Sequence, residues 1–119
     1  MSKSLVETLH AFGLTYPGAH ITTPWPEHAN LVVKDKTFAF LSAPGQPFSL
    51  TCKLPFTAEE ALELPFAQKA GYGLGRSGWV SFKPSEDDMP PLEQLKDWID
   101  ESYRAVAPKT LLKQLVARA

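Results

Sequence analysis

The spacing of apolar residues changes several times along the chain, and each change predicts a new element. A helix is predicted up to Gly13, because a capping-box pattern is followed by apolar residues on one helical face: Ser4 with Glu7, then Leu5, Val6, Leu9 and Phe12. Residues 14–28 are rich in turn formers and prolines, so we expect irregular chain there with one short strand at His20–Thr22.

From residue 31 the apolar period becomes two, which predicts strands. Runs at 31–33 and 38–41 flank a polar link of hairpin length, residues 34–36. A further run at 48–54 alternates strictly, with Phe48, Leu50, Cys52 and Leu54 on one face and Ser49, Thr51 and Lys53 on the other. Short connections make these three strands antiparallel, with one apolar face and one polar face.

The second half of the chain adds helices and one more strand. Thr57 and Glu60 predict a short capped helix that ends near Pro65, and residues 79–83 predict a strand after a glycine-rich stretch. Residues 92–106 carry apolar side chains at intervals of three and four, and a last helix follows Pro108. The order predicts an α+β fold in which N- and C-terminal helices cover an antiparallel sheet, forming an α/β sandwich.

Composition sets bounds on the kind of protein. The 119 residues predict a single domain, 1–119, and a hydrophobic share of 44% is enough to fill its core. Twelve Lys and Arg against 13 Asp and Glu leave a net charge of -1, which argues against a generally polycationic protein. One cysteine cannot form an internal disulfide, and no apolar run has signal or membrane length. We therefore expect a cytoplasmic protein without a membrane partner and favour a monomer.

Few residues suggest catalysis or metal binding. Gly73–Gly78 matches G-x-G-x-x-G, but a strand rather than a helix follows it, which indicates a glycine-rich turn instead of a dinucleotide site. His10, His20, His28 and Cys52 show no metal-ligand spacing and no catalytic motif. We expect His10 on the helix surface and Cys52 in the core, and we predict no enzymatic activity, no metal and no cofactor.

Charged side chains separate into acidic and basic stretches. The acids of the long helix lie on the face opposite its apolar stripe: Glu93, Asp97, Asp100 and Glu101. This pattern is typical of a solvated helix face, and the alternative interpretation is a surface that binds cations. The basic stretches, 66–84 and 104–119, contain no acid. Cations beside glycines and aromatic residues are typical of phosphate contact, and the alternative is ordinary surface charge with Trp79 in the core.

Several short stretches, in order and spacing, resemble the MmcQ/YjbR family over residues 16–109: Tyr16-Pro17-Gly18-Ala19, Lys36–Leu41, Ser49–Lys53, Gly71-Tyr72 leading to Trp79, and Ile99–Arg104. The resemblance implies a frataxin-type (CyaY-like) sandwich, also called a double-wing fold, and a DNA-binding role. The chain departs from the family pattern at 73–78, where glycines replace polar residues and only Arg76 keeps a cation.

We therefore predict a non-enzymatic DNA-binding module that holds phosphate weakly through six side chains: Lys69, Tyr72, Arg76, Lys83, Lys109 and Lys113. The alternative is a protein or small-ligand interaction domain with no nucleic-acid role. The arrangement of the two basic stretches discriminates between them, because a joint phosphate surface requires both stretches to lie on one side.

Overall fold

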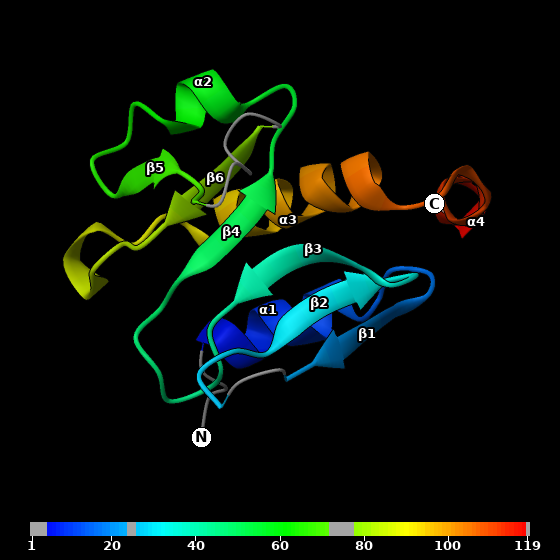
Figure 1. The fold of residues 1–119 in the computed structure, drawn as a ribbon, viewed down its shortest axis with the longest axis horizontal. Helices are drawn as coiled ribbons and strands as arrows, with labels where there is room; N and C mark the ends of the chain where they lie inside the picture. The colour runs from blue at the N-terminus through cyan, green and yellow to red at the C-terminus, as the bar shows by residue number, and fades with distance from the viewer. Residues whose placement is uncertain (1–4, 24–25, 72–77, 119) are drawn as a thin grey trace.

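A six-stranded antiparallel sheet forms the centre of the molecule, with strand order β1-β2-β3-β4-β6-β5 (Figure 1). The computed structural model describes residues 5–23, 26–71 and 78–118. The strands are β1 (Ala19–Thr22), β2 (Asn30–Val33), β3 (Lys36–Leu41), β4 (Leu50–Lys53), β5 (Ala67–Lys69) and β6 (Trp79–Phe82). The antiparallel pairing of the three central strands confirms the prediction from the period of two.

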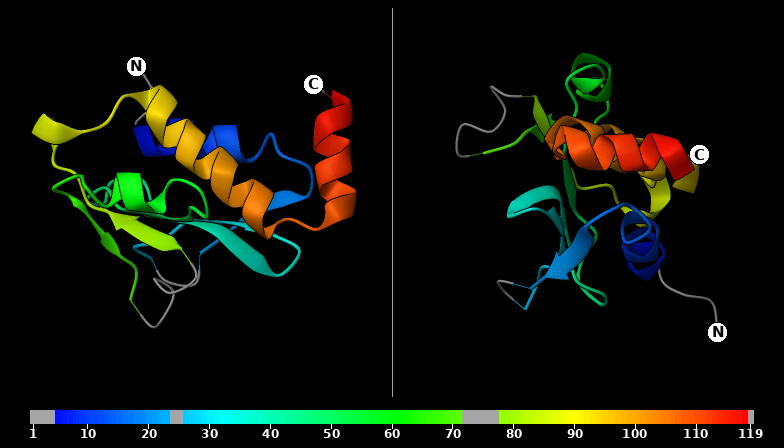
Figure 2. Two further views of the ribbon diagram at one scale, coloured as in Figure 1. Left: turned by 90° about the horizontal axis from the view of Figure 1, so that it is seen from above. Right: turned by 90° about the vertical axis from the view of Figure 1, so that its right-hand side faces the viewer.

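Helices cover one face of this sheet. They are α1 (Leu5–Gly13), α2 (Ala58–Ala61), α3 (Leu92–Val106) and α4 (Lys109–Arg118), with a 3-10 turn η2 (Glu86–Asp88) before α3. Figure 2 shows α1 and α3 side by side over the sheet, while α4 stands at one end of the molecule. The arrangement confirms the predicted α+β class, with N- and C-terminal helices over an antiparallel sheet.

Aromatic side chains join α3 to the sheet and to the turn after α1. The Trp98 ring stacks on Phe82 of β6, with 3.9 Å between the ring centroids. The Tyr103 ring stacks on Tyr16 at 4.5 Å, and its hydroxyl donates to the Pro17 carbonyl at 2.6 Å. These contacts fix α3 across β3 and β4, and therefore also fix the polar face of α3 relative to the sheet.

The turn between β2 and β3 has the two-residue form expected for a tight hairpin. Val33 pairs with Lys36, and the two residues between them, Lys34 and Asp35, have φ values of 50° and 54°. Two successive positive φ angles define a type I′ turn, whose twist matches that of the flanking strands. The predicted polar link at 34–36 is confirmed as a hairpin.

Three local predictions need correction. His10 is buried rather than on the surface, because its Nε2–H donates to the Ala29 carbonyl at 2.6 Å. Thr57 precedes α2 but makes no side-chain cap, since its hydroxyl donates to Glu101 of α3 instead. Strand β5 was not predicted, as Ala67-Gln68-Lys69 has no apolar alternation. The Ser4 cap, Pro24, Trp25 and most of the Gly73–Gly78 motif lie outside the described residues.

Candidate nucleic-acid interface

The pairing of β4 with β6 separates the side chains of the sheet onto two faces. Leu50 pairs with Phe82 and Cys52 with Val80, and all four are buried beneath the helices. The alternate pair Thr51 and Ser81 points the other way, with 2.9 Å between the two hydroxyl oxygens. The face that carries Thr51 and Ser81, turned away from α1 and α3, is called the open face below.

A groove of about 630 Å³ runs along one half of the open face. Phe40, Thr51 and Ser81 form its floor, and the exposed Lys83 stands just beyond the end of β6. Its remaining lining residues are His28, Ser49, Ala70, Gly71 and Phe82. Hydroxyls, a phenyl ring and one ammonium group therefore share this concave surface.

A second, smaller groove of about 320 Å³ continues from Phe40 beyond the open face to the end of α3, so only part of it lies on that face. Two further lysines line it, Lys36 from β3 and Lys53 from β4, together with Thr37, Trp79, Ala105 and Val106. Phe40 lines both grooves and packs edge-on against Trp79, with 5.5 Å between the ring centroids. The described residues that line the two grooves include three lysines and no Asp or Glu.

The structure separates the basic residues that the sequence predicted to act together. Lys83 lines the open-face groove, whereas Lys69 pairs with the buried Val80 and therefore sits on the helical side of the edge strand β5. Lys109 and Lys113 are exposed on α4, at the opposite end of the molecule from β5 and β6 (Figure 1). Tyr72 and Arg76 lie outside the described residues. Among the described residues, the lysines of the two basic stretches do not meet on one surface.

The residues of the two grooves that were missing from the predicted contact set include two lysines and a phenyl ring: Lys36, Lys53 and Phe40. A signal for Lys53 was present, because the period of two already placed it on the polar face of its strand. Phe40 joins it through the register of β3 against β4, where Phe40 pairs with Thr51, and Lys36 joins it as a lining residue of the second groove. Trp79 is 8% exposed, so it belongs to the core. This agrees with the alternative interpretation of the basic stretches, which placed Trp79 in the core.

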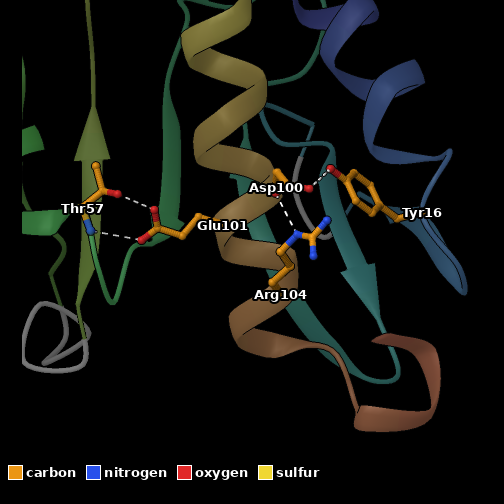
Figure 3. A network of polar contacts seen from close by, with 5 residues as sticks. All are labelled: Tyr16, Thr57, Asp100, Glu101 and Arg104. Carbon is orange, nitrogen blue, oxygen red and sulfur yellow. Dashed lines mark hydrogen bonds and ion pairs between the residues drawn. The ribbon is translucent and has the colours of Figure 1, made fainter. Parts of the chain in front are cut away.

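The acidic face of α3 is only partly a solvated surface. The Glu101 carboxylate accepts hydrogen bonds from the Phe56 and Thr57 amides at 3.0 and 3.1 Å and from the Thr57 hydroxyl. Asp100 accepts from the Tyr16 hydroxyl at 2.5 Å and from the Arg104 guanidinium at 2.9 Å (Figure 3). Both carboxylates therefore hold neighbouring segments in place, which the sequence pattern did not indicate.

The described part of the chain shows where the candidate thiol and the candidate metal ligands lie. Burial, and to a lesser extent the charge of Glu101, raise the pKa of the Cys52 thiol, which stays protonated in the core as predicted for a small core residue. No group of three or more His, Cys, Asp or Glu side chains within the described ranges is placed to hold a metal ion. In those same ranges, no helix is long and apolar enough to cross a membrane.

The family of the chain follows from comparison with known proteins. The YjbR family model matches residues 14–105, so the chain belongs to the YjbR family. Protein DR2400 of Deinococcus radiodurans, which has a DUF419 domain, is similar in structure with a TM-score of 0.72. That similarity covers 92% of this chain and 86% of the other at 24% identity, and it shows a shared fold. No curated protein sequence gives a significant match.

Proposed function

We propose that this YjbR-family domain is a non-enzymatic DNA-binding module that uses the open face of its sheet. The observation that carries the proposal is the pair of adjoining grooves with three lysines around Phe40 and no acid among their described lining residues. Ammonium groups hold phosphates without regard to sequence, and an aromatic ring offers a stacking surface to any unpaired base. The proposal includes a cytoplasmic location.

Binding is expected to be weak and governed by salt. A net charge of -1 provides no long-range attraction for a polyanion, so the local lysines must supply the affinity. If Lys36, Lys53 and Lys83 each reach a phosphate, log affinity should fall against log salt with a slope of about -2.7 for duplex DNA and about -2 for single strands. We expect affinity no tighter than about micromolar at physiological salt.

The test is a fluorescence anisotropy titration with random-sequence duplex and single-stranded oligonucleotides at low salt. Lys83→Ala should weaken binding to all sequences alike and make the salt slope shallower by about 0.7 to 0.9, because one phosphate contact is lost. Lys113→Ala is the matched control, since it removes the same charge from exposed α4 at the other end of the molecule. Equal effects of the two changes, or no binding at tens of micromolar protein, would refute the proposal.

A second candidate function is a protein or small-ligand interaction domain with no nucleic-acid role. The observation that favours it is the separation of the two basic stretches, with Lys69 and Lys83 on different faces and Lys113 at the far end. The described lysines of the two stretches do not form a joint phosphate surface, which supports this candidate. A negative oligonucleotide titration would leave this candidate in place.

A further inference from the structure

Phe56 is the most exposed large hydrophobic residue in the described part of the chain. Its side chain is 92% exposed, compared with 44% for Leu14 and 37% for Ile21, the other exposed residues of this kind. A phenyl ring left in water gains free energy when a partner covers it. Scattered, partly exposed apolar side chains are ordinary on protein surfaces, but an almost fully exposed phenyl ring at the edge of a groove has the form of a contact residue.

The loop that carries Phe56 is held in place by α3. The Glu101 carboxylate accepts from the Phe56 backbone amide. It also accepts from the Thr57 backbone amide and from the Thr57 hydroxyl (Figure 3). Hydrogen bonds to an ionised carboxylate are stronger than those between neutral groups. Because the loop is already held in one conformation, little conformational entropy is lost when a partner covers the phenyl ring.

A groove of about 570 Å³ lies between this loop and α3. Pro55, Phe56 and Ala105 give it apolar walls, and the other lining residues are charged: Lys53, Asp97, Asp100, Glu101 and Arg104. The lining residues carry charges of both signs, so the balance between them determines the net charge of the groove.

The charged side chains that line the groove are three carboxylates and two cations, Lys53 and Arg104, so the groove carries a net negative charge. Asp100 is paired with Arg104, and Glu101 is occupied by the loop. Asp97 is exposed and makes no hydrogen bond or ion pair with another described residue. Its neighbour Lys96 has its ammonium 5.3 Å from the centre of the Phe12 ring, on the side of α1. The groove therefore combines an apolar wall with a net negative charge, to which Asp97 contributes an exposed carboxylate.

We propose that this groove binds a short basic peptide segment of a partner protein. A large apolar side chain of the segment packs on Phe56 and Pro55, and an adjacent Arg or Lys pairs with Asp97. Charge complementarity selects this occupant, because Asp97 repels the phosphates that the open face would attract. The proposal concerns a different surface from the DNA-binding proposal, although Lys53 and Ala105 line grooves of both.

The experiment is selection of random twelve-residue peptides on the immobilised full chain, followed by anisotropy titration of the enriched peptides as fluorescent synthetic probes. We expect enriched sequences to share an Arg or Lys close to an aromatic or large aliphatic residue. Phe56→Ala should weaken their binding about tenfold or more, as loss of a central contact residue does. Asp97→Asn should weaken it about threefold and reduce its salt dependence.

Leu14→Ala is the control, because it shortens another exposed apolar side chain outside the groove and should leave peptide affinity unchanged. Phe56→Ala should keep the thermal midpoint of the wild type, since the ring contributes almost no burial. Enriched peptides without a common pattern, or peptides that bind Phe56→Ala as well as wild type, would overturn the proposal. Oligonucleotide binding should be unchanged in Phe56→Ala, which separates failure here from failure of the DNA-binding proposal.

Discussion

Gly13 allows α1 to approach β2 more closely than a residue with a side chain would. A Cβ atom at this position would lie 2.4 and 2.8 Å from the two Cδ atoms of Leu31, a fully buried residue. The sequence predicted this glycine as a helix stop, and α1 does end there. The contact with Leu31 is a second reason for a glycine at this position. Because Leu31 lies 18 positions further along the chain, the local sequence pattern could not indicate this contact.

Gly13→Ala should therefore destabilise the protein by about 1–3 kcal/mol, because Leu31 must move within a packed core. Urea unfolding followed by circular dichroism measures the change. Gly71→Ala is the matched control, since a Cβ atom there meets no heavy atom within 4 Å, and its stability should stay within about 1 kcal/mol of the wild type. Equal stabilities of the two variants would contradict the packing argument.

Predictions for single residues were correct where the apolar period of the element determines burial. They were wrong where a residue far away in the sequence determines the environment of the side chain. Cys52 lies in the core because it falls on the apolar side of an alternating strand. His10 was expected on the surface, yet it is buried by its hydrogen bond to Ala29, 19 residues further on. Glu101 was assigned to a solvated face, and its partners, the Phe56 and Thr57 amides, come from a loop more than 40 residues earlier.

At the scale of elements, Ser102 of α3 connects β3 and β4 just beyond the last residues that pair in their ladder. The β3–β4 ladder includes the pair of Ala39 with Cys52. One residue further on, the Ser102 hydroxyl donates to the Phe38 carbonyl at 2.5 Å and accepts from the Lys53 amide at 2.8 Å. The helix thus satisfies a carbonyl on one strand and an amide on the next.

Ser102→Ala should cost about 2–4 kcal/mol of stability, because two backbone groups lose a partner in a buried position. The measurement is the free energy of unfolding in urea. Ser81→Ala serves as the control, since its half-buried hydroxyl bonds only to the Thr51 side chain among the contacts described, and about 1 kcal/mol or less is expected. A cost for Ser102→Ala no larger than that of the control would show that the bridge is unimportant.

Helices and strands with a regular spacing of apolar residues were predicted from the sequence. Elements that depend on contacts with another element were not. The strands β2, β3 and β4 and the helix α3 all show clear apolar repeats in the sequence. Strand β5 has three residues with exposed or half-buried side chains and exists through its pairing with β6. The cap predicted for α2 failed for the same reason, because the Thr57 hydroxyl finds a stronger acceptor in Glu101.

At the scale of the whole molecule, acids and lysines gather in different grooves, although Lys53 lines grooves of both kinds. Three acids of α3 line the groove beside Phe56, and three lysines line the two grooves that meet at Phe40. The sequence showed that acids and bases separate along the chain, but the lysines of these two grooves come from β3, β4 and the residue after β6. Only the folded arrangement of three strands brings them together, so the predicted contact set included Lys83 and omitted Lys36 and Lys53.

The central claim, that the open face contacts DNA, is tested most directly by NMR titration of the labelled chain with a short single-stranded oligonucleotide at low salt. Amide shifts should concentrate on the strands of that face, around Phe40, Thr51 and Ser81, and those of exposed α4 should stay unchanged. Shifts centred on α4 or on the acidic side of α3, or no shifts at hundreds of micromolar protein and oligonucleotide, would contradict the account.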